Sequence, residues 1–287
     1  MTDIPHPFPY QGSKRKLAAR ILAYLPARAE RLVEPFAGSA AVTLAAARQQ
    51  RARRFLLNDL HAPLTRLWHA ILHAPEPLAD DYEALWTQQQ GQERAFFDRV
   101  RDDFNRSQEP HCLLYLLARC VKAAVRYNAS GEFNNSPDNR RLGMRPAAMR
   151  RNLLATASLL HDNTEVQCRD YREVLAEARP GDVVYLDPPY QGVTESANHR
   201  YCQGLRRDDF AAALDDLNRR GIPFLVSYDG RTGDKVHGQP LPAELKLHRI
   251  ELPVGRSSQA TLLGKDEATV ESLYLSASIH RCANLPP

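Results

Sequence analysis

Asp187, Pro188, Pro189 and Tyr190 directly follow residues 183–186, a run of four strand-forming residues. Asp187 precedes a proline, so its backbone is extended rather than helical, and its carboxylate accepts hydrogen bonds. Pro188 has no N–H group and offers its carbonyl oxygen as a second acceptor. Tyr190 adds a flat face for stacking. Two acceptors beside an aromatic face suit the exocyclic amine of a planar base.

Such a group of residues could activate an aromatic amine as a nucleophile. The lone pair of the adenine amine is delocalised into the ring, and acceptors outside the ring plane favour a more tetrahedral nitrogen. The lone pair is then directed at an electrophilic carbon, so the catalysis consists of positioning and electrostatics. A base inside a duplex could not reach these residues, so the nucleotide must be flipped out. A simple proline-rich turn is the alternative, and the position directly after a strand disfavours it.

A second candidate site is the glycine turn in residues 33–42, VEPFAGSAAV. Gly38 lies between a predicted strand and a predicted helix, so a ligand can approach its backbone, and the helix N-terminus offers free N–H groups. Asp59 ends the next strand, about 20 residues later, where nucleoside-binding sheets place a carboxylate for ribose hydroxyls. A lone glycine turn is a weak signal, and a tight helix–strand contact without a ligand is the alternative.

The elements that must position these residues alternate between strand and helix at both ends of the chain. Residues 13–25 predict a helix that Ser13 caps, with one apolar face. Residues 206–221 predict a helix with acidic residues at its N-terminus, and residues 246–254 and 270–278 predict closing antiparallel strands. Residues 62–161 are mostly helical, with a polar insert at 128–146. This order predicts an open α/β sheet, built from residues 1–61 and 162–287, with a second domain inserted at 62–161.

Several ordered motifs resemble those of the Dam-type (D12-class) DNA adenine-N6 methyltransferases, which use S-adenosylmethionine. The motifs are PYQGSKRKL (9–17), VEPFAGSAAV (33–42), FLLND (55–59), VRYNASGEFN (125–134), CRDYREVL (168–175) and DPPY (187–190). They follow the family's α order over nearly the whole chain. The resemblance implies a Rossmann-like methyltransferase sheet with an inserted, mainly helical DNA-recognition domain that carries a hairpin-like loop near 128–146.

The resemblance also implies roles for single residues. The catalytic motif comprises Asp187, Pro188, Pro189 and Tyr190. Contacts to the S-adenosylmethionine cofactor are implied for Tyr10, Lys14, Glu34, Phe36, Gly38, Asp59, Asp170, Tyr171 and Asp187. DNA contacts are implied for the segment that contains Arg126, Tyr127, Asn128 and Asn134.

Two departures from the family pattern stand out. Ala40 occupies the place of the second glycine in the family's cofactor loop. After Asn134 the chain reads NSPDNRR, with the proline one place later than in the family and no following glycine. That stretch belongs to the DNA-reading segment, so the GATC target of Dam enzymes is not carried over.

A cluster of arginines begins within the hairpin-like loop and continues beyond it. Residues 134–151 are basic, with one acid at Asp138, and such a stretch could contact DNA phosphates and base edges. A solvated surface is the alternative. Ser227, Tyr228 and Asp229 end a predicted strand and are interpreted as surface-turn residues, with contact to the target base as the alternative. The DNA-contact candidates in the basic stretch are Arg140, Arg141 and Arg145.

The composition excludes several classes of protein. The 287 residues are 43% hydrophobic and 25% charged, an ordinary globular mixture, and the net charge is +4, so a nucleic-acid surface must be a local patch. No apolar run reaches the ~20 residues of a membrane span. The five scattered cysteines and ten histidines show no metal-ligand spacing, and no metal is expected. The N-terminus lacks a secretory signal, which favours a cytoplasmic, bacterial or phage-type enzyme.

These observations predict a site-specific DNA methyltransferase that acts on the N6 amine of a flipped-out adenine in double-stranded DNA. Methylation of cytosine N4 or of an RNA adenine remains open, because the acceptor chemistry is the same. A non-catalytic DNA-binding regulator on the same fold is a further alternative. A cognate restriction enzyme is one candidate protein partner, and no membrane partner is expected.

Overall fold

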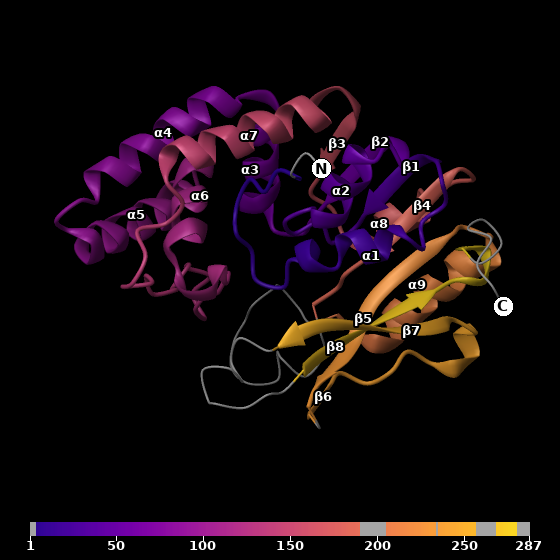
Figure 1. Cartoon of the computed structure of the whole chain (residues 1–287). Helices are drawn as coiled ribbons and strands as arrows, with labels where there is room; N and C mark the ends of the chain where they lie inside the picture. The colour runs from indigo at the N-terminus through magenta and orange to yellow at the C-terminus, as the bar shows by residue number, and fades with distance from the viewer. Residues whose placement is uncertain (1–3, 190–204, 234, 257–267, 280–287) are drawn as a thin grey trace.

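A single twisted sheet forms the centre of the molecule (Figure 1). The computed structural model describes residues 4–189, 205–233, 235–256 and 268–279. Within these residues the strand order is β3-β2-β1-β4-β5-β8-β7, and β6 pairs with β5. Neighbours from β3 to β5 are parallel, whereas β8 pairs antiparallel with both β5 and β7. The strands are β1 (Ala29–Glu34), β2 (Ala52–Asn58), β3 (Thr164–Gln167), β4 (Asp182–Leu186), β5 (Phe224–Thr232), β6 (Lys235–His237), β7 (His248–Arg256) and β8 (Ala268–Leu275).

Strand β4 is buried on both faces, which explains its continuous apolar sequence. Val183 and Tyr185 pack into the core on one face, while Val184 and Leu186 pack into a second core on the other. Helices α1 (Ala18–Leu22) and α2 (Ala41–Arg48) contribute to the first core, and α8 (Tyr171–Ala176) and α9 (Arg207–Arg219) contribute to the second. The predicted α/β sheet with closing antiparallel strands is therefore confirmed.

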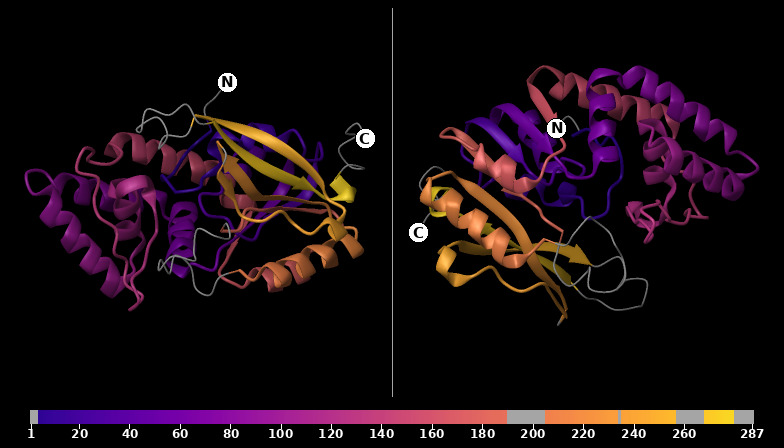
Figure 2. Two further views of the ribbon diagram at one scale, coloured as in Figure 1. Left: turned by 90° about the horizontal axis from the view of Figure 1, so that it is seen from below. Right: turned by 180° about the vertical axis from the view of Figure 1, so that it is seen from behind.

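A group of helices separates β2 from β3 in the sequence. These helices gather at one end of the molecule, beside the sheet (Figures 1 and 2). Their apolar side chains continue the first core of the sheet. The helices are α3 (Ala62–His73), α4 (Pro75–Gln88), α5 (Glu93–Ser107), α6 (Pro110–Arg119) and α7 (Pro146–Leu160).

Between α6 and α7 the chain folds into an irregular segment with short antiparallel pairing. Cys120 pairs with Pro137, and Tyr127 pairs with Phe133. The Asn128 N–H donates to the Glu132 carbonyl at 2.8 Å, which closes the turn. We call residues 126–134 the hairpin. It lies at the beginning of the expected loop, and residues 138–145 form a separate irregular connection to α7.

Two local expectations are wrong. Residues 13–25 form a short 3-10 helix, η1 (Lys14–Lys16), followed by α1, and Ser13 makes no side-chain cap. Ser13 Oγ instead accepts from Ser39 Oγ at 2.8 Å, because the segment lies against the glycine turn. Ser227, Tyr228 and Asp229 lie inside β5 and are at most 2% exposed; they are sheet residues and not a surface turn. Within the described residues, no helix combines the length and apolar character needed to span a bilayer.

Candidate active site at the carboxyl ends of β1, β2 and β4

The strand order places a topological switch point beside the predicted site residues. Strands β1 and β4 are neighbours, and the chain crosses to opposite sides of the sheet from this pair. Ligands of open α/β sheets bind at the carboxyl ends of the strands at such a switch point. Glu34 ends β1, Asp187 follows β4, and Asp59 follows β2. The structure thus brings three predicted acids to one edge of the sheet.

Asp187 is held by a lysine from the N-terminal segment. The Lys14 Nζ lies 2.8 Å from Asp187 Oδ1 and 3.4 Å from Glu271 Oε2. Burial raises the pKa of Asp187 to about 6, the Lys14 ammonium opposes this rise, and the Glu271 charge adds to it. The family resemblance implies that Lys14 contacts the cofactor. Its described ion pairs join it to Asp187 and to Glu271.

The rest of the motif continues from the sheet. Pro188 is buried and Pro189 is partly buried, whereas Tyr190 lies outside the described residues. One hydrogen bond joins the end of β4 to the neighbouring strand β5. The Tyr185 hydroxyl of β4 and the Ser227 hydroxyl of β5 are 2.9 Å apart, and both residues are buried. This contact fixes β5 beside the end of β4.

The glycine turn packs against an aromatic residue of the N-terminal segment. Gly38 has φ +49°, and a Cβ on it would lie 3.2 Å from Tyr10 Cε1. Any side chain would therefore be strained twice, by the backbone and by Tyr10. Trp68 of α3 supports the turn from the other side, because its indole N–H donates to the Gly38 carbonyl at 2.9 Å. Ala40, at the family's second glycine, has φ +48°, a glycine-like conformation that costs alanine roughly 1–2 kcal/mol.

Asp59 is a buried carboxylate at the end of β2. Its Oδ2 accepts from the Gly38 N–H at 3.1 Å, and its Oδ1 accepts from the His61 N–H at 3.0 Å. Burial raises the pKa of Asp59 to about 6, and these two N–H groups oppose the rise. A carboxylate has about four acceptor positions. Asp59 therefore shapes the glycine turn, and its two hydrogen bonds use only part of its acceptor capacity.

Glu34 fills the N-terminus of α2. Its Oε1 accepts from the Thr43 N–H at 2.6 Å, and the residue is 2% exposed. Burial raises the pKa of Glu34 to about 8, the hydrogen bonds from Thr43 oppose the rise, and the charge of Asp187 adds to it. The Thr43 N–H at the N-terminus of this helix is therefore not free for a ligand. Glu34 links the first strand to the helix that follows the glycine turn.

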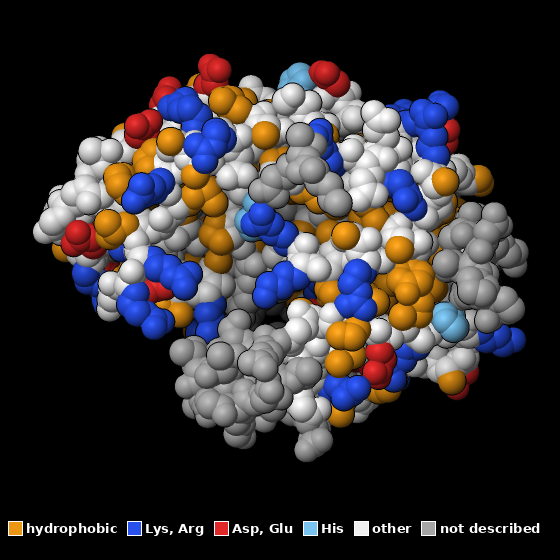
Figure 3. Space-filling model, viewed as in Figure 1, with side chains coloured by type: hydrophobic (Ala, Val, Ile, Leu, Met, Phe, Trp, Pro, Cys, Tyr) orange, Lys and Arg blue, Asp and Glu red, His pale blue; other side chains and the backbone are white. Residues whose placement is uncertain are grey.

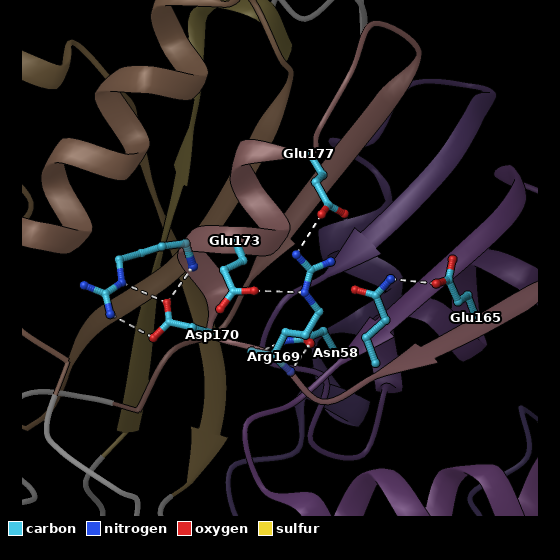
Figure 4. A network of polar contacts seen from close by, with 8 residues as sticks. Asn58, Glu165, Arg169, Asp170, Glu173 and Glu177 are labelled. Carbon is cyan, nitrogen blue, oxygen red and sulfur yellow. Dashed lines mark hydrogen bonds and ion pairs between the residues drawn. The ribbon is translucent and has the colours of Figure 1, made fainter.

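Phe36, Tyr171 and Phe210 form an aromatic group on the second face of the sheet. The ring centroids of Phe36 and Tyr171 are 5.2 Å apart, and those of Tyr171 and Phe210 are 5.9 Å apart. Asp170 caps α8 by accepting from the Arg172 N–H at 2.9 Å, and its carboxylate also pairs with the Arg172 guanidinium (Figure 4). This pairing lowers the pKa of Asp170. The predicted cofactor residues Phe36, Asp170 and Tyr171 are thus neighbours.

The hairpin contains Arg126, Tyr127, Asn128 and Asn134, the residues for which the family resemblance implies DNA contacts. The Asn134 N–H donates to the Arg126 carbonyl at 3.1 Å. Asn128 uses its side chain within the turn, where Oδ1 accepts from the N–H groups of Ser130 and Glu132. Asn134 is exposed, while Arg126 and Asn128 are partly buried. Among these residues, only Asn134 is exposed, so its side chain is the most accessible to DNA.

Tyr127 connects the hairpin to the sheet. Its hydroxyl makes a hydrogen bond with His61 Nε2, and the His61 N–H in turn donates to Asp59. Burial lowers the pKa of His61 to about 4, so the ring is neutral at pH 7. His61 was not among the expected site residues, and a single histidine after a strand gives no signal for such a contact.

The arginines after the hairpin are exposed. The side chains of Arg140 and Arg141 are each 84% exposed and lie 3.8 and 3.9 Å from the Asp138 carboxylate. Arg145 is exposed directly before α7. Lys and Arg side chains lie on both sides of the hollow in the middle of the face shown in Figure 3. Among the described residues, no group of three or more metal-ligating side chains is present.

The chain is similar in sequence to known DNA adenine methyltransferases. A family model described as "D12 class N6 adenine-specific DNA methyltransferase" matches residues 10–284. The DNA N-6-adenine-methyltransferase of Escherichia phage P1 is 29% identical over 235 residues, which are 78% of this chain but 29% of that protein. The DNA adenine methylase of Serratia marcescens is 31% identical over 193 residues, 66% of this chain and 68% of the relative.

Two further matches complete the comparison. The Retron Ec67 DNA adenine methylase of Escherichia coli is 31% identical over 227 residues, 76% of this chain and 75% of the relative. A solved structure of precorrin 8w decarboxylase from Methanobacterium thermoautotrophicum matches 96% of this chain with a TM-score of 0.40 and 11% identity, and this likeness supports no functional statement.

Proposed function

The chain belongs to the D12 class of N6 adenine-specific DNA methyltransferases, and we propose that it transfers the methyl group of S-adenosylmethionine to the N6 amine of an adenine flipped out of double-stranded DNA. The observation that carries this proposal is the Asp187 carboxylate at the end of β4, beside the switch point of the sheet and 2.8 Å from Lys14. A site-specific DNA methyltransferase (adenine-specific) needs an acceptor group at this place.

The residues around the glycine turn fit S-adenosylmethionine. Tyr10 packs against Gly38, where a Cβ would lie 3.2 Å from Tyr10 Cε1, so these two implied cofactor residues lie together. Asp59 keeps acceptor positions for ribose hydroxyls. Tyr171 and Phe36 offer aromatic faces for the adenine of the cofactor. S-adenosylmethionine supplies, when bound, the electrophilic methyl group of the reaction.

The motif residues would act on the amine of the target adenine. Asp187 and the Pro188 carbonyl each accept one hydrogen of the amine, and Tyr190 stacks on the base. Lys14 holds the Asp187 carboxylate in one orientation through a charge-assisted hydrogen bond. The acceptors make the nitrogen more tetrahedral and direct its lone pair at the methyl group, so the residues contribute orientation and electrostatics. As the new N–C bond forms, the bond between the methyl group and the donor sulfur would break, and the amine hydrogen held by Asp187 would pass to that carboxylate and then to solvent.

Residues 62–161 would then read the DNA, and residues 1–61 and 162–287 would carry out catalysis. The hairpin and the arginines after it project from the helical part of the chain. Exposed arginines suit both phosphates and guanine edges. Extrusion of the adenine brings it to the carboxyl end of β4.

Asp187→Ala tests the proposed chemistry. The variant should lose methyl transfer to DNA by more than about 100-fold, a typical cost of removing an essential positioned group. Filter binding should show that its affinity for DNA is largely retained. Asp182→Ala would be a poor control because that residue pairs with Arg31 in the core; the exposed Asp162→Ala serves instead. Near-normal turnover by Asp187→Ala would exclude this mechanism.

The alternatives differ in their substrate and in their need for a cofactor. Transfer of tritiated methyl groups to matched DNA and RNA oligonucleotides, followed by nucleoside analysis, distinguishes N6-methyladenine from N4-methylcytosine and DNA from RNA. A non-catalytic DNA-binding regulator would bind DNA without transferring methyl groups to any of these substrates.

A further inference from the structure

Glu271 is the second carboxylate on the Lys14 ammonium. Its Oε2 lies 3.4 Å from Lys14 Nζ, and Asp187 Oδ1 lies 2.8 Å from the same nitrogen. The lysine side chain is 5% exposed and each carboxylate is 20% exposed, so salt screens these charges only in part. We propose that Glu271 is a positioning residue of the methyl-transfer site, acting on Asp187 through the Lys14 ammonium. This inference rests on the function proposed above.

The position of Glu271 follows from an irregularity in the sheet. In register, Glu271 of β8 faces Gly230 of β5 and Leu252 of β7. The β5–β8 register shifts between Ser227 and Gly230, as at the β-bulges that re-aim side chains next to active sites. A Cβ on Gly230 would lie 2.5 Å from the Val270 carbonyl oxygen. Only glycine permits this approach, which brings β8 and its carboxylate to the catalytic edge.

The three charges lie close together. One ammonium lies between two carboxylates, so Glu271 places a second negative charge near Asp187. Burial and the Glu271 charge both raise the pKa of Asp187, and Lys14 lowers it. Two further groups interact electrostatically with Asp187: Glu34 of β1 and Tyr185 of β4. Glu271 therefore has two effects, since it anchors Lys14 and also sets the pH below which Asp187 is protonated.

The rate of methyl transfer as a function of pH separates this role from a purely structural one. Asp187 accepts hydrogen bonds from an amine only as a carboxylate, so the wild-type rate should fall as the pH drops through about 6. Glu271→Gln removes a like charge and should move this acid limb down by roughly 0.5–1 pH unit. Its rate on the plateau should fall about 3–10-fold because Lys14 is less well held. Glu271→Asp keeps the charge and should keep the wild-type acid limb.

A matched control lies on the neighbouring strand. Glu251 of β7 pairs with Arg231 at 3.2 Å and is 49% exposed, so Glu251→Gln removes the same charge without touching Lys14. This variant should retain the wild-type pH profile. A shift as large as that of Glu271→Gln would mean that the sheet responds to any lost charge, and the proposal would be wrong.

A titration of the Asp187 carboxyl by carbon-13 NMR distinguishes the failure of this inference from failure of the proposed function. The signal is assigned by its loss in Asp187→Asn. If Asp187 titrates at the same pH in wild type and Glu271→Gln, the inference is overturned, whatever the methyl-transfer activity. If the titration shifts as expected but the wild type methylates no adenine, the coupling among the three charges stands and the proposed function is wrong.

Discussion

Asp59 stabilises the glycine turn, and we propose that it also binds the ribose hydroxyls of the cofactor. Its carboxylate accepts the N–H groups of Gly38 and His61, and its other acceptor positions would bind ribose hydroxyls. Asp59→Ala should weaken S-adenosylmethionine binding by about 1.5–3 kcal/mol, the scale of a hydrogen bond to a charged group. Isothermal titration calorimetry measures this change directly.

The control for this prediction is Asp162→Ala, which removes an aspartate that is 97% exposed. It should leave the dissociation constant unchanged. Asp59→Asn, which keeps one acceptor and the shape of the side chain, should bind with intermediate affinity. An unchanged dissociation constant in Asp59→Ala would show that the ribose assignment is wrong.

Glu34 makes the stability of the protein depend on pH. Its pKa in the folded chain is about 8 against an ordinary value of 4.5, so between these values the native state binds more protons than the unfolded state. Stability from this group is therefore present at low pH and is lost as the pH rises through 8. Glu34→Gln removes the titration, and relative to wild type the variant should gain roughly 1–3 kcal/mol between about pH 5 and 9.

Urea unfolding at several pH values measures this difference. Glu30→Gln is the matched control, because Glu30 lies at the other end of β1, is 55% exposed and pairs with Arg53. Its stability difference from wild type should not vary with pH. If the Glu34→Gln difference were equally flat, Glu34 would be ionised in the native state throughout the range.

At the scale of elements, we predict that the irregular connection between the hairpin and α7 determines which DNA sequence the protein recognises. Arg140 and Arg141 are exposed and only loosely paired with Asp138, so each is available to DNA. Loss of a base contact in an alanine variant should cost about 1–3 kcal/mol and relax the recognised sequence at one position. Loss of a phosphate contact should weaken binding to all sequences alike and reduce the salt slope by about one unit.

Binding of each arginine variant to a panel of single-base site variants at two salt concentrations distinguishes these roles. Arg94→Ala on α5, where the arginine pairs with Asp98 and is 61% exposed, controls for the loss of one positive charge. If neither Arg140→Ala nor Arg141→Ala changed affinity, salt slope or preference, recognition would lie elsewhere in the helices.

The elements themselves were largely predictable because their signals are local. The run at 183–186 is apolar since both faces of β4 are buried, and the glycine and small residues at 37–41 mark a strand–turn–helix. The acids after β2 and β4 could be expected to meet because parallel strands end at one edge. Ser13 was assigned wrongly as a cap, since its partner Ser39 is 26 positions away and capping patterns describe only neighbours.

The contacts among distant residues were not predictable from the sequence. Glu271 reaches Lys14 through a register shift between β5 and β8, and no local pattern encodes that shift. Ser227, Tyr228 and Asp229 resemble a polar turn, yet they are buried inside the sheet. The Tyr228 ring stacks on Phe210 of α9, and the Ser227 hydroxyl lies 2.9 Å from that of Tyr185. Tertiary pairing decided these positions, and hydrophobic periodicity carries no information about it.

For the whole molecule, one apolar core joins the sheet to the helices. The same cluster contains Leu32 and Tyr185 from the sheet and Phe97, Tyr115 and Leu153 from the helical elements. Because neither part buries its apolar surface alone, we expect the two to unfold in one transition. Differential scanning calorimetry should give a single peak whose van't Hoff enthalpy equals its calorimetric enthalpy.

A variant that destabilises the core within the helices tests whether the helices and the sheet unfold together. Leu113→Ala removes a fully buried side chain of α6 and should cost about 2–5 kcal/mol. In a single cooperative unit the whole peak moves to lower temperature. A separate early peak, with the remainder unchanged, would show that the helices form an independent unit.

The hydrogen bond between the Trp68 indole and the Gly38 carbonyl also gives the protein a built-in optical probe. The chain has two tryptophans, at positions 68 and 86, and Trp68 is 1% exposed with its N–H on the glycine turn. Indole emission responds to the polarity and hydrogen bonding around the ring, so a ligand that shifts the turn changes the fluorescence without any label. In Trp86→Phe a single emitter remains, and occupancy of the turn can then be followed in real time by stopped flow.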